Sequence, residues 1–228
     1  MTLQLIAMHG WAGDQRGWAP FAATAEARGW SWRSGERGYG GLAPAMPSWA
    51  DKGLKVLVVH SLGLHLLPAE LLAEADGVIL LASFGRFVPE GAAGRRLRTG
   101  LEGMARALEG DGADAMLRDF LARAAEPVPA DPTTLGIGDQ PVPDAGRSLL
   151  RADLKLLGNT CGLPDGFPHS ARVLIVEAGQ DRIVAAEARQ DLRDALPGSD
   201  LLHLAGAGHC LLNASLIPML MGWLDELA

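Results

Sequence analysis

Residues 56–64 place the tightest constraint on how this chain can fold. They read Val-Leu-Val-Val-His-Ser-Leu-Gly-Leu, a β-branched and aliphatic run that breaks at His-Ser-Leu-Gly before an apolar segment able to start a helix. A strand-to-helix turn of this kind strains the backbone of its serine and lifts the Oγ atom clear of the sheet. It also turns the N–H of Leu62 and the positive end of the following helix toward the reaction. The pattern predicts a buried parallel strand whose end presents Ser61 as a nucleophile.

A second Ser-x-Gly sequence competes with the first. The chain contains 29 glycines, so the pattern alone is a weak signal, and Ser83-Phe84-Gly85 also follows an apolar run, residues 78–82. Residues 64–75, which follow Ser61, suit a helix with a kink at Pro68, whereas Ser83 is followed by Arg-Phe-Val-Pro, which favours a loop. We therefore expect Ser61 to be the nucleophile and Ser83 to satisfy local backbone groups.

Length and composition allow one α/β domain with an insertion. The chain has 228 residues, of which 48% are hydrophobic and 21% charged, as in a folded core. No apolar run reaches the roughly 18 to 20 residues of a membrane span, and the N-terminus lacks a basic signal region, so we expect a cytoplasmic protein with no membrane contact. The net charge of −7 argues against nucleic acid as a partner. Cys161 and Cys210 give no disulfide framework and no metal spacing, and we expect Cys210 to be a buried thiol.

Strand-like and helix-like segments alternate in the two ends of the chain. Strands are predicted at residues 3–8, 30–32, 56–59, 78–82, 172–176 and 200–204, and helices at 14–28, 64–75, 185–196 and 217–227. Between these two ends the pattern is helical only, at residues 94–108, 113–124 and 147–157. The sequence therefore predicts a mostly parallel sheet flanked by helices, with a core of residues 1–85 and 161–228 and a helical lid at about 86–160.

Three residues with complementary chemistry each follow a predicted strand. Ser61, Asp181 and His209 occur in the order Ser, Asp, His. His209 could take the proton of Ser61 and return it to a leaving alcohol, while Asp181 would fix the imidazole tautomer and stabilise its charged form. Glu177 is the alternative acid. Packing or surface roles are expected for the remaining candidate histidines, His60, His65, His169 and His203.

Residues 9–13, His-Gly-Trp-Ala-Gly, follow the first predicted strand. Small residues here would let the backbone approach a ligand closely and point N–H groups at it. We expect the N–H of Trp11 to join that of Leu62 as an oxyanion donor, and the indole of Trp11 to wall an acyl pocket. The alternative is that Gly10 and Gly13 only form a turn.

Together these motifs resemble the α/β-hydrolase superfamily over essentially the whole chain. Within it, the chain is similar to the biotin-pathway carboxylesterases that remove the methyl group from pimeloyl-[acyl-carrier protein] methyl ester, through His9-Gly10-Trp11, His60-Ser61-Leu62-Gly63, Asp153-Leu154-Lys155, Gly179-Gln180-Asp181 and Gly208-His209. The resemblance implies the α/β-hydrolase fold and a triad of Ser61, Asp181 and His209. It also implies oxyanion donors at Trp11 and Leu62. We expect no metal, because no cluster of His, Asp or Cys has the spacing of metal ligands, and no cofactor.

The resemblance further implies a lid whose arginines meet the acidic acyl-carrier protein. Residues 86–106 contain five arginines and two glutamates, a local charge of +3. The candidate carrier contacts are Arg95, Arg96 and Arg98. The implied function is a serine carboxylesterase that acts on methyl pimeloyl-carrier protein through an acyl-enzyme. The alternatives are a broader-specificity short-chain ester hydrolase and a non-catalytic binding protein with a hydrolase fold.

The chain departs from the family pattern in three places. The strand-to-helix turn at Ser61 corresponds to the nucleophile elbow of the family. Val59 stands where the first glycine of the elbow is usual, and a β-branched side chain there would crowd the turn. This feature favours the non-catalytic alternative. Leu64 replaces a common later glycine. The chain begins directly at the strand that leads to His9, so we expect an N-terminally trimmed form of the fold.

Overall fold

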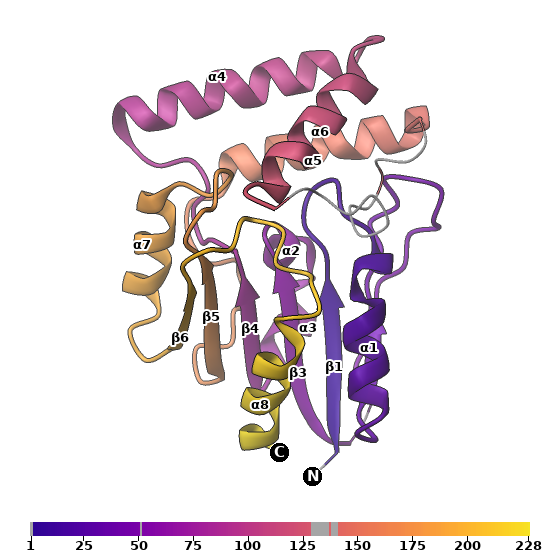
Figure 1. The fold of residues 1–228 in the computed structure, drawn as a ribbon, viewed down its shortest axis with the longest axis vertical. Coiled ribbons are helices and arrows are strands. Elements are labelled where there is room, and N and C mark those ends of the chain that lie inside the picture. The colour runs from indigo at the N-terminus through magenta and orange to yellow at the C-terminus, as the bar shows by residue number, and fades with distance from the viewer. Residues whose placement is uncertain (1, 51, 129–136, 138–140) are drawn as a thin grey trace.

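The computed structural model describes residues 2–50, 52–128, 137 and 141–228. Six strands form one sheet in the order β2-β1-β3-β4-β5-β6. They are β1 (Leu3–Met8), β2 (Ser31–Ser34), β3 (Leu54–His60), β4 (Gly77–Leu81), β5 (Arg172–Ala178) and β6 (Asp200–Leu204). Every pairing between neighbouring strands is parallel, so their carboxyl ends meet at one edge, uppermost in Figure 1.

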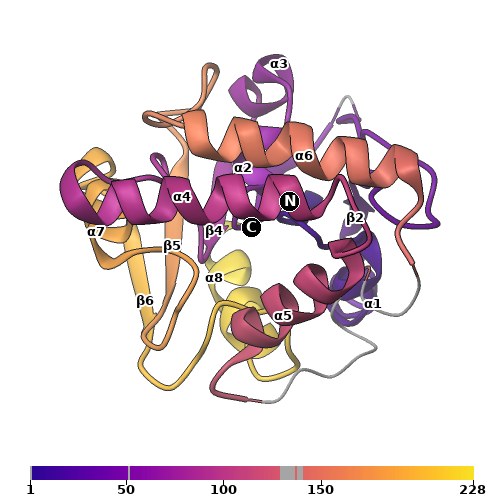
Figure 2. The same ribbon diagram turned by 90° about the horizontal axis from the view of Figure 1, so that it is seen from above.

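Helices cover both faces of the sheet (Figures 1 and 2). The short 3₁₀ helix η1 (Gln15–Trp18) leads into α1 (Ala19–Glu26), which shares one face with α8 (Ile217–Leu227). The opposite face carries α2 (Gly63–Leu66), α3 (Ala69–Ala73) and α7 (Ala186–Ala195). Because successive strand side chains point to opposite faces, Val56 and Val58 pack toward α1 and α8, while Leu57 and Val59 pack toward the other layer.

Three helices follow β4 and lie over the carboxyl edge of the sheet (Figures 1 and 2). They are α4 (Gly91–Ala107), α5 (Ala113–Ala125) and α6 (Asp144–Asn159), hereafter the lid helices. A third cluster of buried apolar side chains joins them to the core, and it includes Leu117, Leu150 and Trp11. Of the predicted lid, residues 129–136 and 138–140 lie outside the described residues.

The helix predicted at residues 64–75 is divided in two. Leu67 and Pro68 are both extended, with ψ of 143° and 146°, so α2 ends and α3 begins around them. Proline lacks a backbone N–H and disfavours the helical conformation in the residue before it. The predicted kink is therefore a break.

Strand β5 is two residues longer than predicted. Glu177 and Ala178 pair with His203 and Leu204 of β6, so Glu177 lies inside a strand and not beyond its end.

In the described part of the chain, no helix combines the length and the apolar character that crossing a bilayer requires.

Candidate active site

Ser61 lies in the tight turn between β3 and α2. Its φ of 54° is in the left-handed region, where a residue with a side chain is strained. Two glycines make this turn possible. A Cβ atom on Gly63 would lie 2.4 Å from the carbonyl oxygen of Met8, and one on Gly10 would lie 2.8 Å from the Cβ of Ser61. The end of β1 is thereby packed directly against the serine.

Val59 does not enter this turn. It is fully buried within β3 and belongs to the same apolar cluster as Leu64 and Met8. The two residues that depart from the family pattern are therefore core residues on the face covered by α2. The crowding expected at Val59 is relieved because its side chain points into that core.

A continuous line of hydrogen bonds joins Ser61, His209 and Asp181. The Oγ of Ser61 is 3.0 Å from Nε2 of His209, and Nδ1 of His209 is 2.9 Å from Oδ2 of Asp181. The other carboxylate oxygen accepts the N–H groups of Ile183 and Val184, at 2.7 and 2.9 Å.

The charge of Asp181 fixes the direction of these bonds. Burial alone would raise the pKa of this carboxyl, but His209 and the two backbone N–H groups hold the pKa below its ordinary value. An ionised carboxylate only accepts hydrogen bonds, so Nδ1 of His209 is the donor and Nε2 accepts the hydroxyl proton of Ser61. Ser61 and His209 are 5% and 3% exposed, which shields both bonds from water.

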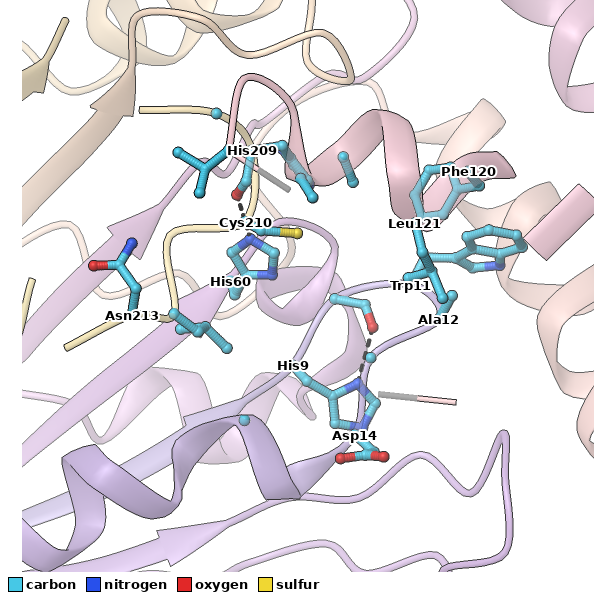
Figure 3. Close-up of a pocket in the computed structure, with 18 of the residues that line it drawn as sticks. His9, Trp11, Ala12, Asp14, His60, Phe120, Leu121, His209, Cys210 and Asn213 are labelled. Atoms are coloured by element: carbon cyan, nitrogen blue, oxygen red, sulfur yellow. Dashed lines mark hydrogen bonds between the residues drawn. The ribbon is translucent and has the colours of Figure 1, made fainter. Parts of the chain in front are cut away.

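His60 supports the loop that carries His209. Its Nε2–H donates to the backbone carbonyl of His209 at 2.9 Å, and the two rings lie 4.9 Å apart (Figure 3). Burial, and then the neighbouring His209, lower the pKa of His60 to about 3. His60 is therefore neutral near pH 7 and places no positive charge beside a protonated His209. The sequence predicted a packing role for His60, but no local signal indicated this contact.

Solved structures with the same architecture include three hydrolytic enzymes. A thermophilic esterase from Thermogutta terrifontis with malate bound is 16% identical, with 99% of this chain and 90% of that chain covered at a TM-score of 0.71. The enol-lactonase from Burkholderia xenovorans LB400 is 16% identical, with 100% and 90% covered at a TM-score of 0.69. A hydrolase from Oleispira antarctica is 15% identical, with 99% and 91% covered at a TM-score of 0.68.

The chain has the α/β-hydrolase fold. The fold class predicted from the sequence is confirmed. A scan against models of protein families gives no match, and no curated protein matches the sequence. Identities of this size show the fold alone, so the chemistry has to be argued from the residues of this chain.

Ser83 orients the peptide group that follows the elbow serine. Its hydroxyl is 3% exposed and donates to the carbonyl oxygen of Ser61 at 2.8 Å. Because a trans peptide is planar, fixing this carbonyl directs the N–H of Leu62 to the opposite side. Within the described residues the N–H of Leu62 donates to no protein group. Ser83 thus satisfies a backbone group, as expected, and that group belongs to the elbow.

His9 orients the peptide group of Trp11 in the same way. The backbone N–H of Arg37 donates to Nε2 of His9 at 3.1 Å, so Nδ1 carries the proton and donates to the carbonyl oxygen of Gly10 at 2.8 Å. The N–H of Trp11 therefore points away from that carbonyl. This N–H also lacks a protein acceptor in the part of the chain that the structure describes.

Glu177, the alternative acid, and the remaining candidate histidines make other contacts in the α/β-hydrolase fold. Glu177 forms an ion pair with Arg193 and lies 3.7 Å from His203, which is half exposed. His65 donates to the carbonyl oxygen of Phe84 at 3.0 Å, and burial lowers its pKa. His169 is exposed.

Neither the cysteines nor the candidate lid arginines take part in the hydrogen bonds that join Ser61, His209 and Asp181. Cys210 is partly buried, and burial raises its pKa to about 11, while Cys161 is exposed. The candidate carrier contacts, Arg95, Arg96 and Arg98, are exposed on α4. The described residues contain no group of three or more His, Cys, Asp or Glu that could hold a metal ion.

Two cavities open beside the line of hydrogen bonds. One, of about 260 Å³, is lined by Ser61 and by apolar side chains of the lid helices, and we call it the Ser61 cavity. The other, of about 230 Å³, is lined by His9, His60 and His209, and we call it the His209 cavity (Figure 3). Trp11 and Phe120 line both, so their rings form the partition between them.

Two contacts tie lid helix α6 to the core of the α/β-hydrolase fold. The indole N–H of Trp11 donates to the carbonyl oxygen of Leu150 at 2.9 Å. Asp153, 2% exposed, accepts two bonds from Arg37, at 2.6 and 2.7 Å, and one from the hydroxyl of Tyr39 at 2.7 Å. Sequence reasoning placed Asp153 in a family motif but gave it no partner.

Proposed function

We propose that this chain is a serine hydrolase of carboxylic esters that works through an acyl-enzyme. The observation that carries the proposal is the unbroken hydrogen-bonded line from Ser61 through His209 to Asp181 beside a cavity that Ser61 lines. Ser61 Oγ attacks the ester carbonyl as Nε2 of His209 takes its proton, and the Asp181 carboxylate stabilises the imidazolium. His209 then returns the proton to the leaving alcohol, and water, activated by the same imidazole, releases the acid.

The negative charge of the tetrahedral intermediate is bound by the N–H groups of Leu62 and Trp11. Both peptide groups are oriented through their carbonyl oxygens before substrate arrives, by Ser83 and His9. Donors fixed in this way need no rearrangement during the reaction, and each such donor typically contributes about 10²–10³ in kcat.

The first candidate substrate is the methyl ester of pimeloyl-[acyl-carrier protein], in a cytoplasmic route to biotin. The resemblance of the sequence motifs and three exposed arginines on α4, Arg95, Arg96 and Arg98, support it. A negatively charged carrier would be drawn to that helix by complementary charge.

The second candidate is a broader-specificity hydrolase of short-chain esters. The observation in its favour is the pair of separate cavities, since the removal of a methyl group requires little room on the alcohol side. Both candidates use the same triad, and they differ in the acyl group and the alcohol group of the ester that is hydrolysed.

The decisive experiment compares the wild type with Ser61→Ala on methyl pimeloyl-carrier protein and on p-nitrophenyl butyrate. We expect turnover that falls by about 10⁴–10⁶ in the variant. Activity on the carrier substrate would support the first candidate, and activity on the small ester alone would support the second. Absence of Ser61-dependent activity on both substrates would contradict the proposal, and absence of any turnover would favour a non-catalytic binding protein.

A further inference from the structure

We propose that the His209 cavity binds the alcohol half of the ester, and that this half is a bulky, uncharged and mainly apolar group of about the size of a benzyl group. The inference rests on the proposed serine hydrolase function and, within it, favours the second candidate over a methyl ester. It follows from which residues line each cavity, from the partition between them, and from the volume and chemistry of the lining.

The position of the cavity relative to the bonds that change assigns it to the alcohol. When the tetrahedral intermediate collapses, the bond between Ser61 Oγ and the acyl carbon is retained, the bond from that carbon to the alcohol oxygen breaks, and the proton on Nε2 of His209 moves to that oxygen. The acyl half therefore stays with Ser61, which lines the Ser61 cavity. The departing alcohol lies beside His209, which lines the other cavity.

A rigid wall keeps the two halves apart. The rings of Trp11 and Phe120 meet edge to face, with centroids 4.8 Å apart. The indole N–H of Trp11 is held by the carbonyl oxygen of Leu150 in α6, so the wall is anchored to the lid as well as to the core. In Figure 3 Trp11 and Phe120 lie together on one side of the drawn residues, with His60 and His209 on the other.

Three polar side chains of the lining are already engaged with the protein. His60 donates to the carbonyl of His209, His9 donates to that of Gly10, and the carboxylate of Asp14 accepts hydrogen bonds from Arg16. Most of the remaining lining is formed by the partition and by apolar side chains such as Leu121, Ala124 and Leu212. A charged or strongly polar alcohol would lose its hydration here without gaining partners.

The volume of the cavity sets the size of the group. An apolar cavity of about 150 Å³ holds a benzene molecule. At about 230 Å³ the His209 cavity has room for an aromatic ring with a further carbon, whereas a methoxy group would leave most of it unfilled. Burying the ring of a benzyl alcohol against this lining would contribute roughly 25 cal/mol for each Å² removed from water.

The test compares kcat/KM for benzyl butyrate and methyl butyrate, which share an acyl group. Leu121→Trp and Asn213→Trp narrow the His209 cavity at its wall and at its exposed rim, and Asn213→Trp keeps the test valid should the buried change prevent folding. The matched control is Gly100→Phe, which narrows the Ser61 cavity at a position where an added Cβ meets no atom within 4 Å.

We expect the wild type to prefer benzyl butyrate, and both tryptophan variants to lower the benzyl-to-methyl ratio by about tenfold or more. The control should keep that ratio and instead lose activity on methyl esters of longer acids. Unchanged ratios in both tryptophan variants, or a change in acyl-length preference in their place, would overturn the inference while leaving the serine hydrolase intact. A wild type without Ser61-dependent hydrolysis of either ester would instead contradict the proposed function.

Discussion

Two peptide groups beside Ser61, those that carry the N–H groups of Leu62 and Trp11, are oriented through their carbonyl oxygens. Ser83 holds the carbonyl of Ser61, and His9 holds that of Gly10, so the N–H groups of Leu62 and Trp11 are set before any substrate binds. Ser83 was the rival nucleophile in the sequence. In the structure its hydroxyl donates to the carbonyl oxygen of Ser61 and so fixes the orientation of the following peptide group.

Ser83→Ala should therefore lower kcat by about tenfold with little change in KM, because a mobile Leu62 N–H weakens a bond made to the oxyanion. Steady-state kinetics on p-nitrophenyl butyrate would measure both constants. The matched control is Ser148→Ala, whose hydroxyl donates to the carbonyl of Asp144 on the exposed surface of α6, and which should leave both unchanged. A rise in KM at constant kcat for Ser83→Ala would refute this role.

His60 should make the stability of the protein depend on pH. Its pKa is about 3 in the folded state against 6.5 when unfolded, so between these values the unfolded state binds the extra proton. The contribution of His60 is complete above pH 6.5 and falls by roughly 1.4 kcal/mol per pH unit below it. His60→Gln keeps a donor for the carbonyl of His209 but does not titrate.

Urea unfolding of the wild type and His60→Gln at pH 7 and pH 5 would measure this effect. The stability advantage of the wild type should shrink by roughly 2 kcal/mol at the lower pH. An advantage of the same size at both pH values would show that His60 titrates normally in the folded protein.

Among the secondary-structure elements, those with complete local patterns are predicted to the residue. Strand β6 and helix α8 have the predicted bounds, because Pro-Gly before the strand and Ala-Gly after it delimit the first, and an apolar face with an early proline defines the second. Strand β5 is longer than predicted because its last two residues are paired by β6, a non-local contact. The helix after Ser61 is broken because the residue before Pro68 becomes extended as well.

In the candidate site, too, the features that follow from a local sequence pattern could be predicted, and those that depend on non-local contacts could not. Ser61, Asp181 and His209 could be located because each follows a strand in a known chain order. The contacts of Arg37 with Asp153, of Trp11 with Leu150 and of His60 with His209 join residues more than a hundred positions apart. These contacts arise from docking of the lid and the final loop, and no local pattern encodes them.

Asp153 should stabilise the docking of α6 more than an exposed ion pair does. Asp153→Asn leaves Arg37 without its counter-charge in a partly buried place, and we expect a loss of about 2 to 3 kcal/mol. Arg151, which also lies on α6, forms an ion pair with Glu109 in which both side chains are about half exposed. Glu109→Gln breaks this pair and should cost at most about 1 kcal/mol. Urea unfolding of both variants gives the comparison, and equal losses would refute the stronger role of Asp153.

Across the molecule, positive charge is concentrated in one segment at the start of the lid. Residues 86–106 carry +3 within a chain of net charge −7, so the remainder carries −10. Four of the five arginines in this positive segment lie on α4, over the carboxyl edge of the sheet where the strands end near Ser61 (Figure 1). A negatively charged partner that delivers a substrate would approach from this side with the least repulsion.

The combined change of Arg95, Arg96 and Arg98 to alanine tests this approach. On methyl pimeloyl-carrier protein it should raise KM by about tenfold at low salt with kcat preserved, and the effect should fade as salt screens the charges. On p-nitrophenyl butyrate the same variant should match the wild type, because the small ester carries no acidic partner. An unchanged KM for the carrier substrate would show that these arginines do not help to bind the carrier.

The role of Ser61 as the nucleophile of an acyl-enzyme is tested by the intact mass of the protein after reaction with a fluorophosphonate, followed by peptide mapping. We expect one adduct per chain, located on Ser61, and no adduct in Ser61→Ala. An adduct on Ser83 or elsewhere, or an unmodified wild type, would contradict it.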